Sequence, residues 1–136
     1  MASWRDVRRI ALALPETGEK SASGGTFAWI VRDRTFAWER PLRRADLAAL
    51  GKDAPTGPVL GTRTADLETK DMLLAADPAV FFTTPHFNGY AAVLVRLDRI
   101  TSAALRDVLV ESWLARAPKR VAADFLAAKL QRLRRI

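Results

Sequence analysis

His86 is the only histidine in the chain and the residue with the most obvious potential for acid–base chemistry. An imidazole in a loop between two strands has the chemistry of a general base or of one half of an acid–base pair. A metal site would need carboxylates around it, because the chain has no cysteine, and the nearest acids in sequence are Asp77 and Asp98. We therefore interpret His86 as a residue that stabilises its loop. An undetected enzyme that uses His86 is the least favoured alternative.

Other residues with reactive chemistry lack the spacing that their reactions need. None of the serines lies in a nucleophile-elbow pattern. The glycines at 24–25 and 57–61 lack the P-loop lysine and the dinucleotide-binding spacing, so we interpret them as turn glycines. The acids Asp66, Glu68 and Asp71 surround the start of an expected helix, where they complement the helix dipole. We predict no catalytic residue, no metal and no cofactor.

The tryptophans fall into two pairs with different expected roles. Trp4 and Trp113 lie on the apolar stripes of expected helices, which predicts that both are core residues. Trp29 and Trp38 lie in two aromatic runs that indicate a hairpin. Core packing is the commoner fate of such residues. The alternative is that they pair across strands and line a groove, because aromatic faces stack on bases or planar ligands.

The first half of the chain must position these aromatic residues through one helix and a hairpin. Ser3 is expected to cap the helix and Pro15 to end it, and spacings of three and four place an apolar set on one face: Trp4, Val7, Ile10, Ala11 and Leu14. We expect a Gly/Ser-rich loop at 17–25, then a hairpin of the runs 26–32 and 35–40 separated by Asp33-Arg34. Residues 45–50 indicate one or two helical turns ended by Gly51.

The second half repeats the alternation of strands and helices. Residues 59–64 are predicted to form a strand, and Asp66 to cap a helix that ends at Asp77-Pro78. Strand patterns at 79–83 and 91–97 flank a loop with the strong turn dipeptide Asn88-Gly89 and predict a second antiparallel pair. Ser102 is expected to cap a helix that ends at Ala117-Pro118, and a last helix follows from Lys119. The whole pattern predicts an α+β fold, an antiparallel sheet packed against N-terminal and C-terminal helices.

Composition fits a single domain spanning residues 1–136, with 49% hydrophobic and 27% charged residues. The absence of cysteine excludes disulfides, thiolate zinc sites and cysteine nucleophiles, and suits a reducing compartment. The N-terminal residues lack the continuous apolar segment of a signal peptide, and no apolar run approaches the roughly 18–20 residues of a membrane span. We therefore expect a cytoplasmic protein with no membrane partner.

The net charge of +7 is concentrated at one end of the chain. Residues 116–136 hold seven basic residues and one acid, so the remainder carries only +1. We treat 117–136 as a basic C-terminal helical extension whose leucines and cations follow different helical spacings. The leucines, Leu126, Leu130 and Leu133, are predicted to dock on the domain. That leaves a candidate nucleic-acid-binding set facing solvent, composed of Lys119, Arg120, Lys129, Arg132 and Arg135. A solvated helix that only keeps the protein soluble is the competing interpretation.

Several segments in register resemble the MmcQ/YjbR family. They are Trp4 with Ala11-Leu12-Ala13-Leu14-Pro15-Glu16, then Ala75-Ala76-Asp77-Pro78, and the loop Phe82-Thr83-Thr84-Pro85-His86-Phe87-Asn88-Gly89-Tyr90. The match continues through Val93, Val95 and Leu97 to Ala117-Pro118-Lys119, so that it spans residues 4–126, while the stretch 41–65 departs from the family pattern.

The resemblance implies a CyaY-like fold, an antiparallel sheet backed by helices, with hairpins likened to a double wing. Members are commonly labelled DNA-binding, but a fold does not fix a function, and the family supplies no established catalytic or ligand residues. Its loop motif is a candidate pocket, formed by Thr84, Pro85, His86, Phe87 and Tyr90. Three functions remain open: a non-catalytic DNA-binding accessory or regulatory domain, a module that binds an unknown protein partner or a small ligand, and an undetected enzyme.

Overall fold

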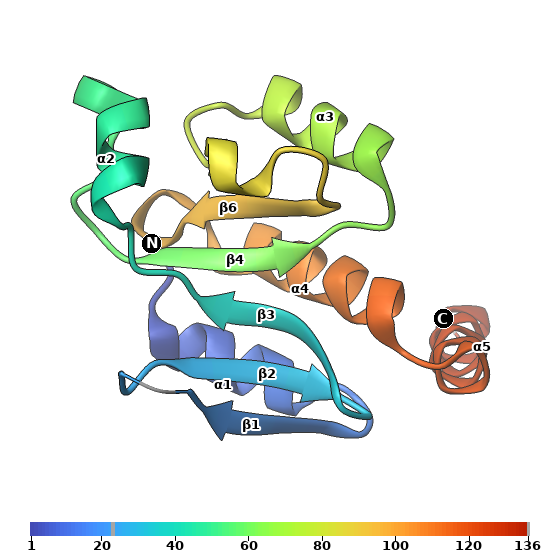
Figure 1. Cartoon of the computed structure of the whole chain (residues 1–136). Helices are drawn as coiled ribbons and strands as arrows, with labels where there is room; N and C mark the ends of the chain where they lie inside the picture. The colour runs from blue at the N-terminus through green and yellow to red at the C-terminus, as the bar shows by residue number, and fades with distance from the viewer. Residues whose placement is uncertain (23, 136) are drawn as a thin grey trace.

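Antiparallel strands form one sheet in the order β1-β2-β3-β4-β6-β5 in the computed structural model, which describes residues 1–22 and 24–135 (Figure 1). The strand bounds are β1 Thr17–Ser21, β2 Phe27–Val31, β3 Arg34–Glu39, β4 Val59–Arg63, β5 Phe81–Phe82 and β6 Ala92–Arg96. The first four strands lie side by side in chain order, and β6 then pairs with both β4 and the short β5. The predicted α+β fold is confirmed.

Two helices cover one face of this sheet. The helix bounds are α1 Trp4–Leu12, α2 Arg44–Leu50, α3 Leu67–Ala76, α4 Ser102–Arg116 and α5 Lys119–Arg134, with short 3₁₀ turns η1 Gly51–Asp53, η2 Pro85–Phe87 and η3 Leu97–Arg99. α4 contacts β3 and β4, and α1 contacts both β1 and α4. In Figure 1, α1 and α4 lie behind the sheet, and α5 follows the end of α4 away from it. No helix in the described ranges has the length and apolar character needed to cross a membrane.

Polar residues at the helix starts explain where the helices begin. Ser3 and Asp6 form the expected capping box on α1, and Asp66 Oδ1 accepts a hydrogen bond from the Thr69 N–H at 2.7 Å. The expected cap at Ser102 is wrong by one residue. Thr101 Oγ1 accepts from the Ala104 N–H at 3.1 Å, and Ser102 is the first helical residue.

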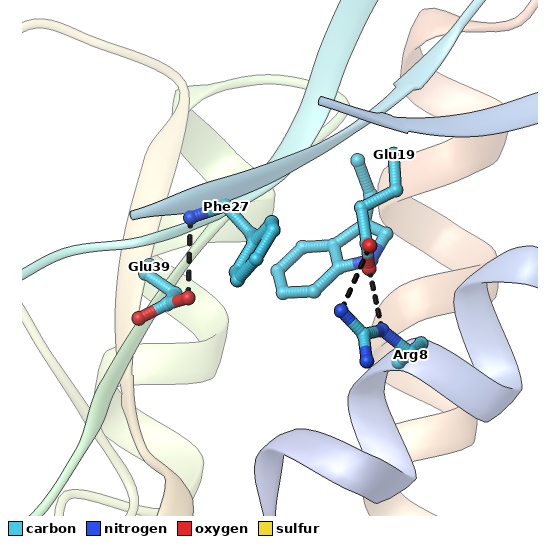
Figure 2. A network of polar contacts seen from close by, with 5 residues as sticks. Arg8, Glu19, Phe27 and Glu39 are labelled. Carbon is cyan, nitrogen blue, oxygen red and sulfur yellow. Dashed lines mark hydrogen bonds and ion pairs between the residues drawn. The ribbon is translucent and has the colours of Figure 1, made fainter. Parts of the chain in front are cut away.

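The predicted loop at 17–25 is wrong over its first five residues, because Thr17–Ser21 form the edge strand β1. Their composition has little strand propensity, so tertiary pairing decides their conformation. Figure 2 shows the contact that joins this edge to α1: Arg8 donates from Nε and Nη2 to the two Glu19 carboxylate oxygens at 2.8 and 2.9 Å. Glu19 Oε1 also accepts from the Trp29 indole N–H at 3.0 Å.

The hairpin of β2 and β3 is confirmed, but its turn lies at Arg32 and Asp33, with φ angles of 47° and 70°, one residue before the expected Asp33-Arg34. Two positive φ values suit the twist of a tight hairpin.

The sheet separates two apolar clusters. The larger lies against α1 and α4 and includes Val7, Ile10, Trp29, Phe36, Leu60, Val95, Leu105, Leu109 and Trp113. The smaller contains Val59, Phe82, Phe87, Ala92 and Leu94. Its Phe87 belongs to the 84–90 loop, which therefore lies on the sheet face opposite α1 and α4.

Candidate functional site

A hollow of about 250 Å³ lies on this second face of the sheet. It is lined by side chains from β3, β4, β6 and the 84–90 loop: Trp38, Arg63, His86, Phe87, Tyr90 and Ala92. We call it the Trp38 pocket. Three aromatic rings, an imidazole and a guanidinium therefore converge from four segments that are far apart in the sequence. The pocket brings together most of the loop motif and one of the two hairpin tryptophans.

The structure separates Trp29 from Trp38. In the β2–β3 register Trp29 lies opposite Ala37, and Trp38 lies opposite Ala28, so the two indoles do not form a cross-strand pair. Trp29 is 2% exposed in the larger cluster and stacks on Trp4, with ring centroids 6.2 Å apart. Core packing therefore accounts for Trp29. Trp38 lies 6.2 Å from Phe87 between ring centroids, on the face that carries the pocket.

The 84–90 loop is held by a buried lysine that the sequence analysis did not single out. Lys70 Nζ donates to the carbonyl oxygens of Phe87 at 2.7 Å and Tyr90 at 2.9 Å. Burial lowers the pKa of the Lys70 ammonium, and nearby Asp71 only partly opposes this effect. Only its helical spacing indicates from the sequence that Lys70 is buried, because Lys70 shares a face of α3 with Leu73 and Leu74, which pack on the core.

A buried ion pair also contacts the 84–90 loop, at the Phe87 ring. Arg40 Nη2 lies 3.0 Å from Asp46 Oδ2, with both side chains nearly fully buried, and the Arg40 guanidinium lies over the Phe87 ring. Burial raises the pKa of the Asp46 carboxyl, but the Arg43 backbone N–H and the Arg40 charge outweigh it, so that this pKa lies below its ordinary value. Phe87 is thereby fixed between the sheet and a charged support.

His86 lies at the exposed side of the pocket. Its ring meets the Phe87 ring edge-on, with centroids 4.8 Å apart, while Pro85 beside it is exposed and Thr84 is buried. Within the ranges 1–22 and 24–135, no group of three or more His, Asp or Glu side chains is placed to hold a metal ion. The loop-stabilising role of His86 stays a prediction.

The prediction for the C-terminal leucines is wrong. Leu126, Leu130 and Leu133 are 43%, 56% and 58% exposed, so they do not dock on the domain. Residues nearer the start of α5 attach it instead: Val121 and Phe125 pack on the core, and the Phe125 ring centroid lies 5.0 Å from that of Trp113. Every residue from 126 to 135 is exposed, because the helix has by then left the body of the protein.

The basic residues of α5 are therefore accessible. The five cations proposed from the sequence are all exposed: Lys119, Arg120, Lys129, Arg132 and Arg135. Positions three residues apart share one side of a helix, so Lys129, Arg132 and Arg135 form a row, which we call the basic row. It has no acidic neighbour in the segment 126–135.

A second group of cations lies where α4 ends, just before α5 begins. Arg34 Nη1 contacts the Arg116 carbonyl oxygen at 3.5 Å. Burial lowers the pKa of Arg116, and the like charges of Arg63 and Arg34 lower it further. The Nε atoms of Arg63 and Arg116 are buried without a hydrogen-bond partner in the described part of the chain. We call Arg34, Arg63 and Arg116 the basic corner. It includes the arginine that lines the Trp38 pocket.

Comparisons with known proteins identify relatives of this chain. Uncharacterized protein Rv2570 of Mycobacterium tuberculosis and Uncharacterized protein Mb2600 of Mycobacterium bovis are each 45% identical to this chain over 130 residues, covering 93% of it and 98% of each relative. The crystal structure of Deinococcus radiodurans protein DR2400, with a DUF419 domain, superposes with a TM-score of 0.63 at 22% identity, covering 84% of this chain and 78% of that one. That likeness shows the fold.

The family model for YjbR matches residues 12–115, which include the whole sheet and the 84–90 loop but exclude α5. This match agrees with the segments that first suggested the family, from Ala11-Leu12 to the loop motif. With the relatives at 45% identity over nearly their full length, it shows that the chain belongs to the YjbR family.

Proposed function

We propose that this protein is a non-catalytic nucleic-acid-binding accessory domain that holds DNA through phosphate contacts along α5. One observation carries the proposal: from Leu126 to Arg135 the helix is exposed on all sides and presents the basic row without an acidic neighbour. Exposed cations on one side of a projecting helix are accessible to a phosphate backbone without any rearrangement of the domain.

The basic corner supports the proposal from the other end of α5. Among the described residues, the four ion pairs within 4.0 Å include none of Arg34, Arg63 or Arg116. No carboxylate in ranges 1–22 and 24–135 therefore pairs with these arginines, and their charge adds to that of Lys119 and Arg120 at the helix start. A polyanion that follows α5 toward the sheet would meet cations at both ends of the helix, although residues 121–128 between them hold no cation and include the acid Asp124.

The type of contact decides what the protein recognises. Lys and Arg side chains that bind phosphate oxygens fix the position of a protein on DNA but carry no sequence information. We therefore expect binding that depends steeply on salt and only weakly on base sequence. A domain of this kind assists a partner at DNA and does not select a site.

Fluorescence anisotropy with a labelled duplex of about 20 base pairs tests the proposal at about 50 mM salt, where phosphate contacts are strong. The key variant replaces Lys129, Arg132 and Arg135 by alanine. Its matched control replaces Lys52, Arg44 and Arg106, which are also exposed, equal in charge and free of ion pairs within the described ranges. The proposal requires that the first variant lose most of the affinity and that the control keep it. Equal losses would indicate only a general charge effect.

The exposed leucines of α5, Leu126, Leu130 and Leu133, which we call the leucine row, favour a second candidate function, a protein-interaction module. The surrounding arginines and lysine define its partner as an amphipathic helix with acidic flanks, since such a helix would cover the leucines and neutralise the cations. Replacing Leu126, Leu130 and Leu133 by glutamine separates the two functions. The DNA affinity should stay unchanged if the phosphate contacts are the function, whereas binding of an acidic amphipathic peptide should be lost if the protein-interaction function is correct.

A further inference from the structure

We propose that the Trp38 pocket binds a single nucleotide unit, with its base among Trp38, Phe87 and Tyr90 and its phosphate at Arg63. The unit has two sources, a free nucleoside monophosphate or an unpaired nucleotide of a longer strand, which share this chemistry. The inference goes beyond the phosphate contacts proposed for α5 and does not depend on them, because none of the pocket residues lies on that helix.

The size of the pocket and the residues that line it determine which ring system of a ligand it can hold. At about 250 Å³ the hollow is slightly smaller than typical small-molecule sites of about 300–1,000 Å³, so it suits one planar ring system. Its aromatic walls come from β3 and from the 84–90 loop, and Ala92, a small residue, lies on β6 among them. Aromatic rings bind bases through their faces with little dependence on base identity. The pocket therefore selects a flat heteroaromatic group.

Arg63 determines the charged group that the ligand must carry beside its ring. The side chain is half-buried, its Nε is buried without a hydrogen-bond partner in ranges 1–22 and 24–135, and no carboxylate of those residues lies within 4.0 Å of it. A guanidinium without a paired carboxylate beside a pocket favours an oxyanion, and planar guanidinium groups hydrogen-bond phosphate oxygens in pairs. The neighbouring cations Arg34 and Arg116 add positive potential to this end of the sheet.

The remaining charged groups near the pocket do not compete for this role. Arg40 is paired with Asp46, and the Lys70 ammonium is bonded to the carbonyl oxygens of Phe87 and Tyr90. These two cations hold the loop that carries the aromatic wall. Arg63 is thus the lining cation available to a ligand among the residues that form the hollow.

Titration of the protein with nucleoside 5′-monophosphates tests the inference by calorimetry and by the indole N–H resonances in NMR. We expect the Trp38 indole resonance to shift while those of the buried Trp29 and Trp113 stay in place, since only Trp38 lines the pocket. The parent nucleoside and inorganic phosphate should each bind more weakly than the monophosphate. In the variant with Lys129, Arg132 and Arg135 replaced by alanine, which removes the phosphate contacts proposed for α5, a short unpaired oligonucleotide that binds more tightly than the monophosphate identifies a strand as the source, and the reverse order identifies a free nucleotide.

Two variants and a control decide the assignment. Arg63→Gln should weaken monophosphate binding about 10- to 100-fold, as expected for a lost charged hydrogen bond. Tyr90→Ala, which removes a 58% exposed ring and so should leave the fold intact, should weaken it about tenfold. Arg106→Gln, an exposed arginine on α4, is the control and should bind as the wild type does. No shift of the Trp38 resonance with any monophosphate or oligonucleotide at about 5 mM would overturn the inference, as would wild-type affinity in both pocket variants.

The basic-row triple alanine variant separates this inference from the proposed function. It should lose duplex binding and keep the Trp38 shift with monophosphates. If it instead abolishes the Trp38 shift, the pocket is not an independent site and the inference is wrong. Loss of duplex binding alone leaves the pocket assignment supported.

Discussion

The Trp38 indole occupies the space that a side chain at Gly61 would need, because a Cβ at Gly61 would lie 2.6 Å from Cζ2 of the indole. The absence of a side chain on β4 lets the indole lie against the strand backbone and form a wall of the pocket. Gly61→Ala should therefore displace the indole and destabilise the protein by about 1–3 kcal/mol, as overpacking does.

Urea denaturation and the Trp38 indole resonance measure the effect of Gly61→Ala. Gly18→Ala is the matched control, since Gly18 is also a strand glycine and its added Cβ would meet Ile30 Cγ1 at an ordinary 3.8 Å. Equal stability of Gly61→Ala and the wild type, with an unmoved Trp38 resonance, would show that the indole does not occupy this place.

Lys70→Met should destabilise the protein by about 2–3 kcal/mol, because the Phe87 and Tyr90 carbonyl oxygens lose their donor. Amide hydrogen exchange should rise in the 84–90 loop more than in the sheet, since the ammonium is bonded to that loop. Lys20→Met, at an exposed lysine on β1, should change neither quantity. Uniform exchange across loop and sheet would contradict the anchoring role of Lys70.

Asp46→Asn should cost about 3–5 kcal/mol at neutral pH, because Arg40 would remain buried without its carboxylate. The pKa of Asp46 is lowered by folding, so the stabilisation is present above the carboxyl's ordinary value of 3.8 and is lost as the pH falls through the lower folded value. Thermal melts from neutral to acidic pH should show this loss in the wild type and a smaller one in the variant. Asp107→Asn, at an exposed acid on α4, should behave as the wild type.

Phe125→Ala should destabilise the attachment of α5 by about 1.5–2.5 kcal/mol, since Phe125 is half-buried against Trp113. Leu130→Ala, at a 56% exposed leucine, should stay within about 0.5 kcal/mol of the wild type. Denaturant melts of the two variants measure the difference. A larger loss for Leu130→Ala would mean that the leucine row docks after all.

Local patterns predicted most helices and the two hairpins, because caps such as Ser3 and Asp66 and the apolar spacing of α1 act within a few residues. The edge strand β1 escaped prediction, since Thr17–Ser21 take their conformation from pairing with β2. The leucines of α5 have the spacing of a helix face that packs on a core, but they are exposed because α5 leaves the body of the protein after α4. The periodicity of a helix does not encode the direction in which the helix runs.

The pocket was only partly predictable for the same reason. The sequence marks both the loop motif 84–90 and Trp38, but their proximity in the pocket depends on the order of β3, β4 and β6 in the sheet. Arg63 gave no sign of its role and Lys70 gave only its spacing on α3, because a single cation in a strand or helix usually faces water. Their significance comes from burial, which the sequence does not show.

The salt dependence of duplex binding tests the central claim most directly. With about three phosphate contacts from Lys129, Arg132 and Arg135, the logarithm of affinity should fall against the logarithm of salt concentration with a slope near −2.7. The triple alanine variant should remove most of that slope, and duplexes of different sequence should give the same line. No binding at about 50 mM salt, or a triple variant with the wild-type slope, would contradict DNA binding through α5.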